Sequence, residues 1–71
     1  MTNYTRAEAI KLIRKTARDN GMTFKRQRIR INGHASYCFV NRQTGVPVIE
    51  NMLFWTAWEN CMSGYIASRS V

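Results

Sequence analysis

The dipeptide Asn32-Gly33 constrains the fold of this chain more than any other feature of its sequence. The residues before it, TFKRQRIRI over 23–31, alternate in character with the period of two that is typical of a β-strand. Asn-Gly is the preferred pair for a two-residue hairpin turn, because both turn positions need a positive φ. The sequence therefore predicts a β-hairpin made of strands over 23–31 and 35–41.

A two-residue turn also predicts which residues face each other across the hairpin. On one side of the sheet, Ile31 should face His34 and Ile29 should face Ser36. The other side should pair Arg30 with Ala35, Arg28 with Tyr37, and Arg26 with Phe39. Because Ile29 and Ile31 require burial, we expect the isoleucine side to lie against the core and the arginine side to face solvent.

Helix signals flank the hairpin. Thr5 and Glu8 have the spacing of a capping box, and Gly21 can end a helix that covers 5–20. Asn51 is a suitable N-cap for a second helix over 52–63.

A third strand over 46–49 should occupy a sheet edge, because Pro47 cannot donate a ladder hydrogen bond. The prediction is one α+β domain over 1–71, in the order α-β-β-β-α, with a three-stranded antiparallel meander. Both helices should pack on one face of the sheet, and nothing places the tail over 65–71. The buried face is expected to carry Ile29, Ile31, Cys38, Val40 and Ile49.

The net charge of the chain indicates its class of partner. Eleven Lys and Arg residues stand against four Asp and Glu, which gives +7. Ten of these basic residues lie within positions 1–42. Such a basic balance favours anionic partners, above all nucleic acid.

The predicted arginine side of the hairpin is the leading candidate site. Arginine neutralises phosphates and can bind guanine edges, while an exposed aromatic ring can stack on a base. The alternative is that these are ordinary outward-facing strand residues, with guanidinium groups resting on rings. The predicted function is non-enzymatic binding of nucleic acid, DNA rather than RNA and duplex DNA in particular. The predicted contacts are Arg26, Arg28, Arg30, Tyr37 and Phe39, with Lys25 and Arg42 at the rim.

A second basic stripe lies on the predicted first helix. Its members, at helical spacing, are Lys11, Arg14, Lys15 and Arg18. The stripe could lie along a phosphate backbone or could simply keep the helix face soluble. In a two-layer domain, we expect it to face away from the arginine side of the sheet.

Trp55 supports a rival function. It lies off the apolar side of the second helix, so its ring should be exposed for a protein contact or partly buried against the tail. The rival is an adaptor or inhibitor that binds an acidic protein through the cationic face or through Trp55. We expect a monomer or a weak homodimer in either case.

Metal, cofactor and catalytic signals are weak in this sequence. Cys38, Cys61 and His34 are too few for a structural zinc site, and the cysteines should be reduced and buried. A regular strand would hold His34 and Cys38 about 13 Å apart, too far for a nucleophile and its base. We therefore expect no metal, no cofactor and no enzymatic activity. Met1–Arg6 has no apolar signal segment, and no apolar run is long enough to span a membrane, so we expect a cytoplasmic protein without a membrane partner.

Three resemblances add to these predictions. The order of elements resembles the double-stranded-RNA-binding domain, although NMLFWTAWE over 51–59 has none of the lysines that family carries there. The basic strand resembles the arm-type domains of phage integrases and the plant AP2 domain, which implies a major-groove role for Arg26, Arg28 and Arg30. In TRAEAIKLIRKTARDNG, NRQTG and AWENCMSGYIAS, the chain resembles short accessory proteins of enterobacterial temperate phages, some of which bind host proteins.

Overall fold

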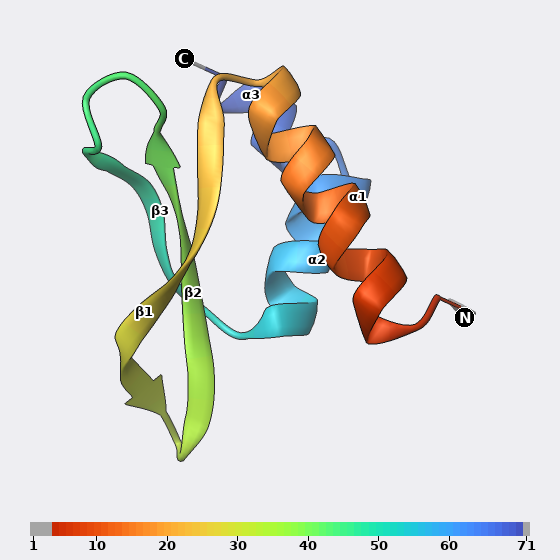
Figure 1. Ribbon diagram of the computed structural model, residues 1–71, viewed down its shortest axis with the longest axis vertical. Helices are drawn as coiled ribbons and strands as arrows, with labels where there is room; N and C mark the ends of the chain where they lie inside the picture. The colour runs from red at the N-terminus through yellow and green to blue at the C-terminus, as the bar shows by residue number, and fades with distance from the viewer. Residues whose placement is uncertain (1–3, 71) are drawn as a thin grey trace.

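A computed structural model describes residues 4–70 of the chain. Residues 1–3 of the Met1–Arg6 segment and Val71 of the tail lie outside the described residues. The elements follow the order α1 (Arg6–Asp19), β1 (Met22–Ile31), β2 (His34–Asn41), β3 (Pro47–Met52), α2 (Phe54–Met62) and α3 (Tyr65–Ser68). Figure 1 shows two layers, a sheet on one side and the helices on the other. The predicted α+β class and the predicted order are confirmed, and α3 is the one added element.

The first helix begins as its sequence predicts. The Thr5 side chain accepts a hydrogen bond from the Glu8 backbone N–H at 3.2 Å, and the Glu8 carboxylate accepts one from the Thr5 N–H at 2.9 Å. These bonds form the expected capping box and lower the pKa of Glu8.

The start of the second helix differs from the prediction. Leu53, not Asn51, occupies its N-cap position and supplies no side-chain cap. Asn51 belongs to β3, where it has a φ of 60°. Its backbone N–H donates to the Gln27 side chain at 2.7 Å, and its own side chain accepts from the Gln27 amide at 3.2 Å. Gln27 on β1 thus reaches across β2 to hold β3.

The sheet is an antiparallel meander in the order β1-β2-β3, as predicted. Pro47 begins β3 and lies on an edge strand, where its missing N–H costs no ladder bond. The other edge strand is β1, which carries all three arginines of the sheet.

The hairpin contains a bulge that the sequence did not reveal. Next to the turn, Ile31 faces His34 and Arg30 faces Ala35, as predicted. Further along, Arg26 faces Tyr37, because residues 27–29 of β1 lie opposite Ser36 alone.

The side chain of Ser36 fits inside this bulge. Ser36 is fully buried, and its hydroxyl donates to the Ile29 carbonyl at 2.6 Å. The hydroxyl thereby satisfies a strand carbonyl that the bulge takes out of the ladder.

The helices cover the opposite side of the sheet from the one predicted. Phe39 is 0% exposed under the helices, whereas Ile29 is 54% exposed. Cys38 and Val40 are buried, but they alternate with Phe39 along β2 and so point to the other side. Of the five residues expected against the helices, only Ile49 packs there.

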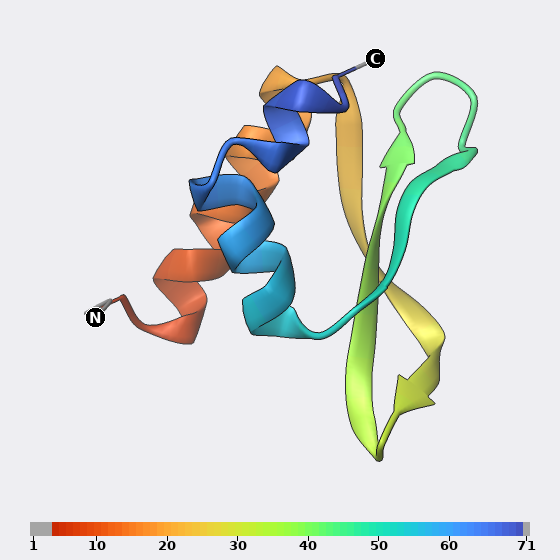
Figure 2. The same cartoon turned by 180° about the vertical axis from the view of Figure 1, so that it is seen from behind.

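The reason for this reversal is the position of the isoleucines along the hairpin. Figures 1 and 2 show the turn of the β1–β2 hairpin extending beyond the ends of the helices. Ile29 and Ile31 lie in that uncovered part, whereas Phe24, Tyr37 and Phe39 lie where the helices pack.

One continuous core joins the two layers. From the helices it takes Ala9, Ile13, Ala17, Phe54, Ala57, Trp58, Cys61 and Ile66, and from the sheet Met22, Phe39 and Met52. Ile66 explains why the tail is ordered, since α3 places this side chain fully inside the core.

Burial of both thiols, as expected, makes stability depend on pH. Burial raises the pKa of Cys61 from 9.0 to about 11. An unfolded chain loses this proton near pH 9 and the native protein only near pH 11, so the free energy of unfolding should fall as the pH rises between them. Urea titrations over this range should show a steeper fall for the wild-type protein than for Cys61→Ala. Parallel curves would contradict the assignment.

Candidate nucleic-acid interface

The basic side chains of β1 do not form the single row that the sequence predicts. Arg26, Arg28 and Arg30 are all exposed. Arg26 shares the helix-covered side with Tyr37, Arg28 lies in the bulge, and Arg30 donates to the Gly33 carbonyl at 3.0 Å. The three guanidinium groups therefore spread around the outer edge of β1.

The predicted aromatic platform is wrong. Phe39 is fully buried, and Tyr37 is half-buried with its ring stacked on Phe24 at 5.0 Å. The edge of Tyr37 also meets Phe54, with ring centroids 5.7 Å apart. These rings are part of the core because they lie beneath the helices, and neither is an open stacking surface.

The uncovered face of the sheet is not the cationic surface that was predicted. Lys25 lies directly opposite Cys38, and Glu50 is close enough to act on the same thiol. Burial and the Glu50 carboxylate raise the pKa of Cys38, while Lys25 opposes them. This face thus carries charges of both signs around a buried thiol.

The basic stripe of α1 is exposed as predicted, with one difference. Lys11, Arg14, Lys15 and Arg18 all face solvent. Lys15 donates to Asp19 at 2.7 Å, and this bond lowers the pKa of Asp19. Lys15 is therefore neutralised within the helix, and the other three basic residues of the stripe make no ion pair in the part of the chain that the structure describes.

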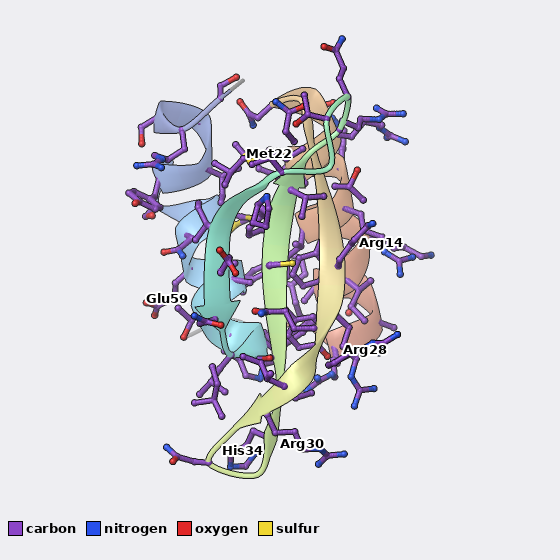
Figure 3. The ribbon with its side chains drawn as sticks, turned by 90° about the vertical axis from the view of Figure 1, so that its left-hand side faces the viewer. Arg14, Met22, Arg28, Arg30, His34 and Glu59 are labelled. Carbon is purple, nitrogen blue, oxygen red and sulfur yellow. The ribbon has the colours of Figure 1, made fainter. Side chains whose placement is uncertain are left out.

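The stripe meets the arginines of β1 instead of facing away from them. Figure 3 shows α1 behind β1, with Arg14 beside the outer edge of that strand. The two layers therefore share a border, and the guanidinium groups of both lie along it. A groove of about 370 Å³ marks this border, and it is lined by Arg14, Arg18, Met22, Thr23, Phe24 and Arg42.

Backbone contacts hold Arg42 at this groove. Its N–H donates to the Gly21 carbonyl at 2.9 Å, which ties the β2–β3 turn to the connection between α1 and β1. The Asn41 side chain shapes the turn itself by accepting from the N–H groups of Gln43 and Thr44 at 2.8 and 3.2 Å. The backbone of Arg42 is thus held in place, and its side chain lines the groove together with Arg18.

We call the resulting surface the basic band. It consists of Arg14, Arg18, Arg26, Arg28, Arg30 and Arg42. Figure 3 shows Arg14, Arg28 and Arg30 along the β1 side and Glu59 at the opposite side of the molecule. Within residues 4–70 the sole ion pair is Lys15–Asp19, so no arginine of the band is in an ion pair, although the charge of Arg18 helps to lower the pKa of the nearby Asp19. Charged side chains can also protect an edge strand from pairing with another chain, and this is the simplest alternative role for the band.

Trp55 is exposed, as one of the two sequence interpretations expected. It is 43% exposed, and its ring lies edge-on to Phe54 at 4.9 Å and to Trp58 at 6.2 Å. Beside it lies a wide groove lined by Trp55, Trp58, Glu59, Met62 and Ser63. The surface of α2 is therefore apolar and nearly uncharged.

Sequence reasoning missed Arg6. Its guanidinium lies 4.1 Å from the centre of the Phe54 ring and donates to the Tyr37 hydroxyl at 3.1 Å. The residue follows the N-cap Thr5 directly, so a search for charges at helix ends, where elements meet, could have found it.

Residues 4–70 contain no group of three metal-ligating side chains and no helix long and apolar enough to cross a membrane. Comparisons with protein-family models, with curated proteins and with solved structures find no match.

Proposed function

We propose that this protein is a non-enzymatic nucleic-acid-binding protein that holds the phosphate backbone of DNA along the basic band. One observation carries the proposal. Arg14, Arg18 and Arg42 come from two separate segments and line one groove. Guanidinium groups bind phosphate with paired hydrogen bonds, and displacing the counterions of the nucleic acid favours the complex.

The position of the aromatic rings decides the expected mode of binding. Phe39 and Tyr37 lie in the core, and Phe24 in the groove is half-buried and stacked on Tyr37, so no exposed ring lies among the arginines of the band. Contacts to phosphates carry no sequence information. Binding should therefore tolerate many sequences and weaken steeply as salt is added.

A chemical-shift titration of the labelled protein with a mixed-sequence DNA duplex tests this function. We expect the amide shifts to concentrate on the residues of the basic band and on the turn around Arg42, at low salt and at physiological salt. The uncovered face around Cys38 should change little. Shifts that are absent, or that are spread over the whole surface and vanish at physiological salt, would reject the proposal.

Exposed apolar residues favour a second candidate, an adaptor that binds another protein. Trp55 and Met62 are exposed beside the groove on α2, where Glu59 is the only charge among the lining residues. The resemblance to phage accessory proteins points the same way. Its signature would be a defined stoichiometry with one protein at moderate salt, lost in Trp55→Ala, with no retention of DNA under the same conditions.

A further inference from the structure

Another hollow lies at the far end of the basic band, where three elements meet. It encloses about 270 Å³ between the start of α1, the start of β2 and the first turn of α2. Its lining consists of Arg6, His34, Ala35, Leu53, Phe54, Trp55 and Thr56. We call it the end pocket. Cationic and aromatic side chains share it, and its Trp55 ring is exposed, whereas Phe24, the aromatic residue in the groove of the band, is half-buried.

Arg6 is held in the end pocket by neutral groups. The Phe54 ring supports its guanidinium face at 4.1 Å, and the Tyr37 hydroxyl accepts one of its hydrogen bonds at 3.1 Å. No carboxylate pairs with Arg6 among the residues that the structure describes. Its remaining N–H donors are thus positioned, with full charge, for an anion.

Trp55 provides the apolar part of the pocket. Its ring is 43% exposed, and the edge contact with Phe54 limits how far it can turn. An aromatic ring held in this way can stack against any base, because every base has a π-face. Arg6 lines the same pocket, and its guanidinium group can donate charged hydrogen bonds to the phosphate of the same nucleotide.

The end pocket continues the basic band. Arg30, the last arginine of the band, lies opposite Ala35, and Ile31 lies opposite His34. Figure 3 shows Arg30 and His34 together at the hairpin turn. A strand that follows the band from Arg42 to Arg30 therefore arrives at the pocket.

We propose that the end pocket binds an unpaired nucleotide of a nucleic-acid strand, with its base stacked on Trp55 and its phosphate on Arg6. The inference rests on the proposed function, since the band must hold the strand that delivers the nucleotide. A duplex hides the faces of its bases, so the pocket selects single-stranded segments and overhanging ends. The band itself binds duplex and single strand alike through their phosphates.

Fluorescence anisotropy with two labelled probes, a blunt mixed-sequence duplex and a short oligothymidylate, tests the inference. Trp55→Leu should lower affinity for the oligothymidylate about tenfold, the range expected for loss of one base–aromatic stack, and leave duplex affinity unchanged. Trp55→Phe should restore most of the loss. Tyr65→Leu is the matched control, because Tyr65 is 44% exposed and lies outside the pocket. It should change neither affinity, and circular dichroism verifies the fold of each variant.

The outcomes separate the two proposals. Failure of the wild-type protein to bind either probe overturns the proposed function, and the inference with it. Duplex binding with unchanged oligothymidylate affinity in Trp55→Leu overturns the inference alone and returns Trp55 to the protein-contact candidate. Equal losses of affinity for both probes in Trp55→Leu would also overturn the inference alone. A blunt duplex offers no unpaired base, so loss of stacking on Trp55 cannot weaken its binding. Displacement of the oligothymidylate by thymidine monophosphate at similar concentration would identify a free nucleotide as the ligand and overturn the assignment to a strand.

Discussion

Phe39→Ala is expected to unfold the protein or to bring it close to unfolding. Phe39 is fully buried in the centre of β2, and its ring packs on Phe24 with centroids 5.2 Å apart. Removing a buried phenylalanine ring costs about 3–5 kcal/mol. A domain of this length has a total stability of roughly 4–10 kcal/mol, so the loss is a large part of it. Urea denaturation followed by circular dichroism measures the effect.

Ile29→Ala is the matched control for the orientation of the sheet. Ile29 is exposed on the same hairpin, and its loss should change stability by less than about 0.5 kcal/mol. The sequence alone predicts the opposite ranking, with Ile29 in the core and Phe39 in solvent. A large loss for Ile29→Ala together with a small one for Phe39→Ala would show that the helices cover the isoleucine side.

The second large effect concerns the groove of the basic band. The double variant Arg14→Ala/Arg42→Ala removes two guanidinium groups that line it. Each lost phosphate contact lowers the slope of log affinity against log salt by about 0.9, so two contacts remove about 1.8. If the wild-type protein and the variant bind equally at 1 M salt, this change of slope corresponds to roughly 60-fold weaker duplex binding near 0.1 M salt. Anisotropy titrations at several salt concentrations give both the slope and the affinity.

A control with the same loss of charge distinguishes a site from general electrostatic attraction. Lys25→Ala/Arg69→Ala also lowers the net charge by two, but Lys25 lies on the uncovered face opposite Cys38 and Arg69 follows α3, so both are outside the band. It should leave the slope nearly unchanged. If both double variants weaken binding equally, the charge acts without a defined site, and the band loses its assignment.

Local signals explain what the sequence could predict. The capping box at Thr5 and Glu8, the turn at Asn32-Gly33 and the edge position of Pro47 each depend on residues close in sequence. The pairs next to the turn were also correct, because a two-residue turn determines register for as long as the strands remain regular.

The bulge interrupts the regular pairing of β1 with β2, and no local feature of the sequence predicts it. Its stabilising contact is the bond from Ser36 to the Ile29 carbonyl, and a serine in a strand usually indicates nothing. The shift by two residues keeps Arg26 on the aromatic side, so the bulge alone did not cause the wrong orientation.

The sheet orientation predicted from the sequence was wrong because it assumed that the helices are long enough to cover the isoleucines near the hairpin turn. The 14 residues of α1 span about 21 Å, whereas the 10 residues of β1 span about 33 Å. Helices this short cannot cover the whole hairpin, and the end nearest the turn, with Ile29, is left out. Comparing these lengths would have favoured burial of Phe24 and Phe39, which lie farther from the turn.

Only part of the candidate site could be predicted from the sequence. Net charge identified the arginines, and periodicity identified the stripe on α1. Their union at one edge depends on α1 lying behind β1, and the grouping of Arg6 with His34 and Trp55 depends on where α2 begins. Both are properties of packing between elements far apart in the sequence.

The hydrogen bonds between Gln27 and Asn51 also bear on how the sheet opens. They join its two outer strands directly, across a sequence separation of 24 residues. The edge strand β3 therefore cannot detach while β1 stays in place without breaking them. We therefore expect local opening of β1 and β3 to be coupled, so that amide hydrogens of these two strands near Gln27 and Asn51 exchange with solvent together.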